Sequence, residues 1–383
     1  MTESGGLRPA VDAETRARVA LSRLSEPGDE QLGEAVQRLG AVATLEALRD
    51  GRLGGTRERH YRTRLGQVDV DLDLEVAGRA GIRLLLPGDD EWPAQLDDLG
   101  PAMPLLLWVD GDGDLAALTR RAVAVVGARA CTAYGEHVAA ELAAGLGDRG
   151  WTVVSGGAFG IDAAAHRGAL AVDASTVAVL ACGVDVAYPS AHDRLLAHIR
   201  SSGAVVSELP PGARPTRGRF LDRNRVIAAL ARGTVVVEAA VRSGAKNTAG
   251  HAESLSRPVM AVPGPVTSAM SAGCHELIRV AGAALVTDAP DVVDIVGDLL
   301  TDASPERRGE RRPHDDLDAV TLRVLDALPL KRWVAPDGVG RAAGLDAPTT
   351  LRSLGTLAAC GLAVTRDGAW RRAPAAPRAT ASS

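Results

Sequence analysis

Apolar and polar positions follow two different periods along the chain, and the change of period divides it into regions. From residue 12 to about residue 112, apolar residues such as Leu21, Leu24 and Leu32 recur at three- and four-residue spacing. This spacing is typical of amphipathic helices. It predicts a small helical N-terminal domain over residues 12–112.

The central region, residues 113–300, has short apolar runs that end at or near glycine and are followed by helical patterns. The runs are VAVVGA (123–128), TVVSGG (152–157), TVAVLACG (176–183), AVVSE (204–208), TVVVEAA (234–240) and VMAVPG (259–264). Uniformly apolar strands that alternate with helices predict an α/β fold, in which a doubly wound, mostly parallel sheet is covered on both faces. Ligands of such sheets bind at the carboxyl ends of the strands.

The pattern of apolar and polar positions changes again after residue 300. Residues 301–316 are charged and nearly without apolar positions, so they are predicted to be a linker. Beyond them, residues 317–372 show helical stretches at 317–328, 338–343 and 349–359, and then a hairpin that turns on Asp367 and Gly368. Three helices and a hairpin predict a winged-helix-like domain. The two ends, residues 1–11 and 373–383, are predicted to be disordered.

Composition narrows the class of protein. A charged content of 24% and a hydrophobic content of 46% are ordinary for a globular protein, whereas aromatic residues make up only 3%. The four cysteines have no paired spacing for zinc or a disulfide, which favours a reducing cytoplasm. The sequence shows no signal peptide and no apolar run of the roughly 20 residues that span a bilayer. A cytoplasmic protein without a membrane partner is therefore expected.

An acidic segment, residues 68–76 (VDVDLDLEV), raises the question of a metal. A calcium loop needs glycine after its third acidic position, and Leu74 stands there instead. The segment is therefore predicted to be a solvated face, and no metal site is predicted.

Two glycine loops follow predicted strands, one at Gly127 and one at Gly156, Gly157 and Gly160. Glycine at a strand end leads the backbone to a helix N-terminus, whose free N–H groups favour an anion. Close packing of helix on strand explains the same glycines equally well. The loops match neither dinucleotide fingerprint nor P-loop, since Arg129 takes the place of the second fingerprint glycine. No G-x-S-x-G hydrolase motif occurs, so neither a cofactor nor a catalytic residue is predicted.

Positive charge is concentrated in one segment of an otherwise acidic chain. The formal net charge is −5, yet residues 205–260 hold nine Arg or Lys against four Asp or Glu. The only phenylalanines are Phe159, in the second glycine loop, and Phe220, among the arginines. Arginines, helix-end amides and exposed aromatics are the parts of a single-stranded nucleic-acid groove. The alternative remains open: the arginines pair with Glu208, Asp222 and Glu238, and the phenylalanines belong to the core.

Seven motifs in sequence order extend this interpretation to a family. They are VAVVGARACTAYG, VVSGGAFGIDAAAHRGAL, VLACGVDVAYP, VVSELPPG, GRFLDRNRVIAALA, VVVEAAVRSGAKNTAGHA and MAVPGP. In order and content they resemble the DNA processing protein DprA (Smf) family over residues 104–296. Many members have arginine where this chain has Phe159.

The resemblance implies an extended Rossmann-like fold that binds single-stranded DNA in a groove, forms a homodimer, helps load the recombinase RecA in natural transformation and has no established enzymatic activity. It implies that Arg129 and the loop glycines face phosphates, that Arg217 and Arg219 flank the groove entry, and that Phe220 stacks on a base. The full predicted contact set is Gly127, Arg129, Gly156, Gly157, Phe159, Gly160, Arg217, Arg219, Phe220, Arg223, Asn224, Arg225 and Lys246. Of these, Lys246 rests on its charge and position rather than on the resemblance.

Two alternatives to DNA binding remain. Rossmann-like nucleotide phosphoribohydrolases carry P-G-G-x-G-T-x-x-E, and this chain has Glu238 after a strand but lacks the glycine pair and the following glutamate. The other alternative is a scaffold whose basic loops bind an acidic protein partner.

Overall fold

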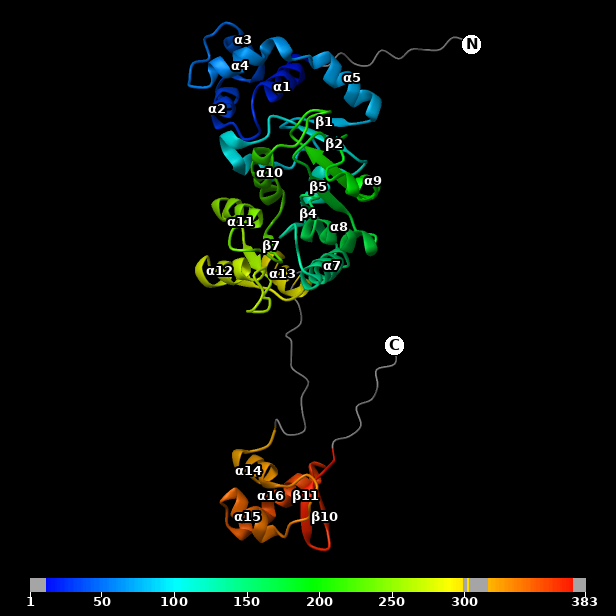
Figure 1. Ribbon diagram of the computed structural model, residues 1–383, viewed down its shortest axis with the longest axis vertical. Helices are drawn as coiled ribbons and strands as arrows, with labels where there is room; N and C mark the ends of the chain where they lie inside the picture. The colour runs from blue at the N-terminus through cyan, green and yellow to red at the C-terminus, as the bar shows by residue number, and fades with distance from the viewer. Residues whose placement is uncertain (1–11, 299–301, 303–315, 375–383) are drawn as a thin grey trace, which may run out of the picture. The chain divides into compact units, whose positions relative to one another are not determined.

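The computed structural model describes residues 12–298, 302 and 316–374. The chain divides into two compact units, residues 1–304 and 305–383, and each is considered by itself. Figure 1 shows their elements. The predicted disordered ends and the predicted linker fall almost wholly outside the described residues.

Five helices build the N-terminal region. They are α1 (Ala13–Leu24), α2 (Glu30–Leu39), α3 (Ala41–Arg49), α4 (Glu58–Arg64) and α5 (Val70–Ala80), with the 3₁₀ turn η1 (Leu65–Gln67) before α5. Asp12, Asp29 and Asp69 accept a backbone N–H at the starts of α1, α2 and α5, as N-cap residues do. Leu21, Leu24 and the α1–α4 side chains around them form one apolar cluster, as the helical spacing predicts.

The acidic segment differs in one respect from the prediction of a solvated face. It forms the start of α5, and its Asp73 is buried, with only 4% of its surface exposed. Asp73 accepts two hydrogen bonds from the Arg23 guanidinium of α1. The helical period places Asp73 inward whereas Asp71 and Glu75 are exposed, which alternating carboxylates in a sequence do not reveal.

The second part of this unit is a sheet of nine strands in the order β1–β2–β6–β5–β4–β3–β7–β8–β9. The strands are β1 (Arg83–Leu85), β2 (Leu107–Asp110), β3 (Ala122–Val126), β4 (Thr152–Ser155), β5 (Thr176–Val179), β6 (Ala204–Ser207), β7 (Thr234–Val236), β8 (Val259–Ala261) and β9 (Ala284–Leu285). Strands β3 to β9 pair in parallel. The prediction of an α/β, Rossmann-like and mostly parallel sheet is confirmed.

The predicted domain boundary near residue 112 needs correction. Strand β2 lies before that boundary, yet Trp108 pairs with Ser207 of β6 in antiparallel register, and β1 pairs with β2. Strands β1 and β2 therefore extend the sheet, although they lie within the range that was predicted to be a helical domain. They are three and four residues long, too short for a clear alternation of apolar and polar positions.

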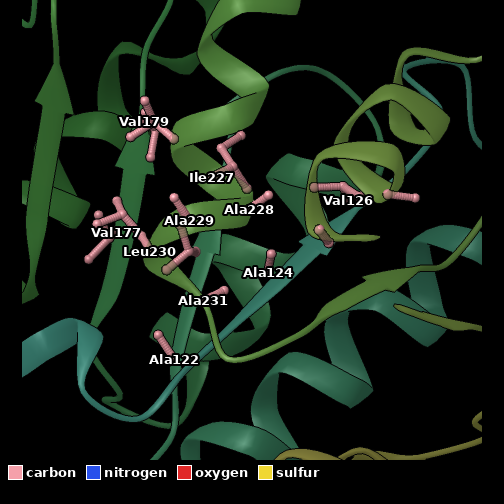
Figure 2. Packing of buried hydrophobic residues seen from close by; sticks show 14 of the residues in the cluster. Ala122, Ala124, Val126, Val177, Val179, Ile227, Ala228, Ala229, Leu230 and Ala231 are labelled. Carbon is pink, nitrogen blue, oxygen red and sulfur yellow. The ribbon is translucent and has the colours of Figure 1, made fainter. Parts of the chain in front are cut away.

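Helices cover both faces of the sheet. They are α6 (Leu115–Thr119), α7 (Ala133–Gly147), α8 (Ile161–Ala171), α9 (Asp193–Ser202), α10 (Arg217–Leu230), α11 (Gly244–Ser254), α12 (Ala272–Val280) and α13 (Ala289–Val296), with 3₁₀ segments η2 (Ala94–Ala102) and η3 (Ser190–His192). In β3, Ala124 and Val126 pack with α10, as Figure 2 shows, whereas Val123 and Val125 pack with α7 and α8. Because both faces are buried, every position of β3 is apolar.

The strand order places a switch point at β3. From β3 the chain continues through β4, β5 and β6 toward one edge, then returns to β7 on the other side of β3 and continues through β8 and β9. At such a point neighbouring loops diverge, which leaves a crevice at the carboxyl ends of the strands.

The second unit contains α14 (Ala319–Ala327), α15 (Pro336–Ala343), α16 (Ala347–Ala359), β10 (Ala363–Arg366) and β11 (Ala369–Arg372). Its two strands pair antiparallel, and Asp367 (φ 50°) and Gly368 (φ 75°) form the left-handed turn between them. Three helices and a hairpin are the expected elements. Their assignment as a winged helix stays a prediction.

Candidate nucleic-acid interface

The two glycine loops meet at the switch point through close packing of their backbones. Gly160 (φ 77°) lies so near β3 that a Cβ built on it would stand 2.3 Å from the Ala128 carbonyl oxygen. A Cβ on Gly156 would stand 2.5 Å from the Arg223 guanidinium. The packing explanation therefore accounts for these two glycines without a bound anion. Gly127 and Gly157 lie in the same two loops, at the ends of β3 and β4.

Four side chains gather above these loops and are called here the arginine–aromatic cluster: Arg129, Phe159, Tyr188 and Phe220. The guanidinium carbon of Arg129 lies 4.4 Å from the centre of the Phe220 ring. The Phe220 ring in turn lies 5.6 Å from the ring of Tyr188, at an interplanar angle of 47°. Phe159, which is 49% exposed, contacts His192 edge to face at 4.8 Å. The cluster thus presents flat apolar faces beside a cation.

A cavity of about 310 Å³ lies next to the cluster, between α10, α11 and the end of β3. One face of helix α10 lines the cavity. Residues three, four and seven positions apart lie on the same side of a helix, and this spacing joins Arg217 to Phe220, Leu221 and Asn224. Arg217 is exposed, and Phe220 is partly buried between the cavity and Tyr188.

Arg223 was predicted to contact DNA, but the structure places it inside the protein. It is 5% exposed and donates hydrogen bonds from Nη1 to the carbonyl oxygens of Gly156 and Val179, at the ends of β4 and β5. Burial lowers the pKa of Arg223 to about 10, although the negative charge of the buried Asp162 acts to raise it. The guanidinium remains charged at neutral pH and holds the two strand ends together.

The next two residues of α10 are also buried. Asn224 donates from Nδ2 to Asn247 Oδ1 at 3.0 Å and so joins α10 to α11. Arg225 lies on the other side of the helix, where its Nη2 is 2.5 Å from Glu208 Oε2. Burial raises the pKa of Glu208, and the Arg225 cation opposes that rise. For Arg225 the structure agrees with the alternative reading of an internal ion pair.

Two further predicted cations are paired at the surface. Arg219 forms a two-pronged ion pair with Glu26 of the N-terminal region, at 2.7 and 3.2 Å. Lys246 Nζ lies 2.9 Å from Glu276 Oε2. By contrast, neither Arg129 nor Arg217 forms an ion pair with any residue that the structure describes.

Sequence reasoning missed Tyr188 and Asp162. Tyr188 is 42% exposed and follows β5, much as Phe159 follows β4. In a chain with three tyrosines and two phenylalanines, an aromatic residue after a strand was a usable signal. Asp162 is 7% exposed at the start of α8, and its carboxylate accepts the Ala158 N–H at 3.4 Å. Burial raises its pKa, so it ionises less readily than an exposed aspartate.

Glu238, the residue that the hydrolase alternative requires, has a structural partner. It is 1% exposed, and its carboxylate accepts hydrogen bonds from the N–H and the hydroxyl of Thr132 at 2.8 and 2.7 Å. Thr132 is the N-cap of α7, so Glu238 stabilises the start of that helix. Within residues 12–298, 302 and 316–374, no group of three or more His, Cys, Asp or Glu side chains could hold a metal ion. The helices in that part of the chain are all too short or too polar to cross a membrane.

A doubly wound parallel sheet with an arginine–aromatic cluster and a cavity at its switch point defines a Rossmann-like protein with a binding crevice. The sequence profile of the family described as DNA recombination-mediator protein A matches residues 83–297. This chain belongs to that family, the DprA (Smf) proteins.

Individual relatives agree. A Mycobacterium tuberculosis protein that carries the DprA name is 47% identical over 94% of this chain and 95% of its own length. The X-ray structure of DNA processing protein A from Streptococcus pneumoniae is similar at a TM-score of 0.63, with 32% identity over 75% of this chain and 99% of that chain. A structure of DNA processing protein A from Helicobacter pylori, described by its single-stranded DNA binding mode, is similar at a TM-score of 0.51. It is 28% identical over 58% of this chain and 97% of that chain.

Proposed function

We propose that this chain binds single-stranded DNA along the arginine–aromatic cluster, protects it, and helps load RecA onto it in natural transformation or DNA processing. The observation that carries the proposal is the Arg129 guanidinium stacked on Phe220 beside the exposed Tyr188 and Phe159. Base stacking needs flat faces, and a phosphate needs an unpaired cation nearby. The Helicobacter pylori relative, described by its single-stranded DNA binding, supports the same ligand here.

The proposed contacts are fewer than the sequence suggested. Arg129 and Arg217 attract phosphates, and the three aromatic rings of the cluster stack on bases. The loop glycines, Arg223 and Asn224 shape the floor. Arg219, Arg225 and Lys246 are already committed to carboxylates, so they are left out of the proposed contact set.

We expect single strands to bind without regard to sequence, in preference to duplex, and with strong salt dependence. Each neutralised phosphate contributes about −0.7 to the log–log slope of affinity against salt on single strands. Fluorescence anisotropy of labelled single-stranded and duplex oligonucleotides at several salt concentrations measures both properties. Tighter binding of duplex, or a flat salt dependence, contradicts the proposal. The scaffold alternative predicts no salt-sensitive binding of DNA, so the same titration separates it from the proposal.

The second unit should be dispensable for this binding. The cluster and the cavity lie wholly within the first unit, which forms a compact body of its own. A chain that ends after residue 304 keeps the ion pair between Arg121 and Asp302. We expect it to bind single strands within about twofold of the full chain. A truncated chain that melts normally but loses most of its affinity would place the site elsewhere.

RecA is a proposed protein partner, because the family is described as a recombination mediator and a mediator acts on a recombinase. A second copy of the chain is also proposed as a partner, on the resemblance to the family alone. Sedimentation of the chain alone tests the homodimer. Strand exchange by RecA on DNA covered with a single-strand binding protein tests the loading step.

We propose no enzymatic function for this chain. A phosphoribohydrolase needs a glutamate free to act on the sugar, whereas Glu238 caps α7 through Thr132. Incubation with nucleoside monophosphates, followed by chromatography, checks this directly. Release of free base would revive the hydrolase alternative.

A further inference from the structure

We propose that the helical N-terminal region holds a second DNA contact site, a basic surface on α4 and the end of α3 that binds the phosphate backbone of the same single strand where it continues beyond the arginine–aromatic cluster. The inference rests on the proposed function and extends it. The surface belongs to residues 49–64, so it lies outside both the sheet and the arginine–aromatic cluster.

Positive charge is concentrated in one segment of the N-terminal region. Residues 49–64 hold six arginines against two acidic residues, whereas residues 12–48 hold four arginines against seven acidic residues. The six, called here the α4 basic surface, are Arg49, Arg52, Arg57, Arg59, Arg62 and Arg64. Dense local cations on an acidic chain favour a polyanion at one place rather than over the whole molecule.

Half of these arginines have no carboxylate partner. Three form ion pairs with acidic residues that the structure describes: Arg52, Arg57 and Arg64. The other three are exposed and have no such pair within the described part of the chain: Arg49, Arg59 and Arg62. An exposed guanidinium without a carboxylate is available to a phosphate, whose oxygens its planar donors fit.

The fold brings these unpaired cations together. Helices α3 and α4 are in contact (Figure 1), and the fully buried Tyr61 holds the inner face of α4 against the apolar cluster. Arg59 and Arg62 are three residues apart and so share the outer face of α4. A Cβ built on Gly51 would stand 2.8 Å from Arg62 Nη1, which places that guanidinium beside the turn after α3, where Arg49 is the last helical residue.

One carboxylate links the α4 basic surface to the start of α10. Glu26, in the turn between α1 and α2, lies 3.6 Å from Arg64 of α4 and 2.7 Å from Arg219 of α10. Arg219 is two residues from Arg217 and next to Phe220 in sequence. A strand that passes Arg217 therefore meets further cations beyond it. This continuity favours the same strand, rather than a separate acidic partner, as the occupant of the α4 basic surface.

A hollow of about 310 Å³ is lined by both α4 and α10, and its charges decide where the backbone runs. Helix α4 contributes Arg57, His60 and Tyr61 to the lining, and α10 contributes Asp222. Asp222 has no ion pair with any residue that the structure describes, so it repels phosphates from the hollow. The backbone therefore follows the arginines of α4 and does not enter the hollow.

Two double variants remove equal charge from different parts of the first unit. Arg59→Gln combined with Arg62→Gln removes two unpaired cations from the α4 basic surface. Arg120→Gln combined with Arg149→Gln is the matched control, because both arginines are exposed and stand shortly before β3 and β4, at the amino ends of the strands. The proposed strand contacts lie at the opposite, carboxyl ends.

The affinity of each full-length protein is measured by anisotropy with oligothymidylates of about 6 and about 24 nucleotides, a short and a long strand relative to a usual single-strand site. Melting curves confirm that each variant is folded. We expect the Arg59 and Arg62 variant to bind the long strand about fivefold more weakly, with a log–log salt slope shallower by about 1.4 for two lost contacts. Its binding of the short strand should be unchanged, and the control should change neither.

A single substitution at Glu26 gives a test of the opposite sign. Glu26→Gln frees Arg64 and Arg219 from their shared carboxylate, so the long strand should bind about threefold more tightly and with a steeper salt slope. This variant removes no arginine, so it tests the inference even if the Arg59 and Arg62 variant does not fold. Unchanged or weaker binding of the long strand would mean that no phosphate reaches this junction, and the inference would be wrong.

Three results of the charge removal would also overturn the inference. They are unchanged binding of the long strand, equal weakening of the short and long strands, and an equal effect of the control variant. Each leaves single-strand binding at the arginine–aromatic cluster in place. If the unsubstituted protein binds neither strand, the proposed function fails, and the second contact site fails with it.

Discussion

Replacing Arg223 by methionine should lower the free energy of unfolding by about 3–5 kcal/mol, the usual cost of removing one member of a buried charged group. The substitution removes the donor to the Gly156 and Val179 carbonyls, which lie at two adjacent strand ends. It also leaves Asp162 buried without the cation that most opposes the rise of its pKa. Methionine fills much of the same volume, so loss of packing contributes little. Urea unfolding followed by circular dichroism measures the change.

Arg217→Met is the matched control, because Arg217 is exposed on the same helix. Its effect on unfolding should stay within about 0.5 kcal/mol, although it should weaken DNA binding. If Arg223→Met unfolds like the unsubstituted protein and loses DNA affinity instead, Arg223 is a contact residue and its structural role is misread.

The second large effect concerns Arg129 and Phe220, which the sequence suggested as independent contacts and which the structure brings into contact. Phe220→Ala should weaken single-strand binding about tenfold or more, because stacking on a base contributes about 1–3 kcal/mol. Arg129→Ala should weaken binding as well and make the log–log salt slope shallower by about 0.7. Because the Phe220 ring supports the Arg129 guanidinium, the two losses should not add.

A double-mutant cycle measures this coupling, which we expect to be about 0.5–1 kcal/mol, the range of an exposed cation–π pair. Phe220 is only partly buried, so its removal should shift the melting temperature little. A large fall in stability with normal affinity would instead identify a core residue, whose loss costs about 3–5 kcal/mol. Strictly additive losses would mean that the stacked arrangement is absent in solution.

The parallel centre of the fold could be predicted because a strand that is buried on both faces has a continuous run of apolar residues in the sequence. Each of the six apolar runs overlaps a strand, from β3 in VAVVGA to β8 in VMAVPG. The strands β1, β2 and β9 were missed. They have two to four residues each, and β1 and β2 join the sheet by antiparallel pairing with distant partners. Such pairing depends on tertiary contacts rather than on the local sequence.

The location of the site stays a prediction, but the structure shows how the predicted residues are arranged. Charge density drew attention to α10, yet consecutive residues of a helix point about 100° apart, so Arg223, Asn224 and Arg225 make different contacts. The residue spacing on α10 held more information than the count of arginines did. Arg217, Phe220, Leu221 and Asn224 share one face, and that face lines the cavity.

The pairing of β2 with β6 has a consequence for the order in which the chain folds. Trp108 and Ser207 are neighbours in the sheet although almost one hundred residues separate them in sequence. During synthesis β2 leaves the ribosome before β6, so its fully buried Leu107 and Trp108 are made before the strand with which β2 pairs. The β3–β6 segment must form before β2 has an edge to join, so the earliest part of this sheet to be made is among the last to be completed.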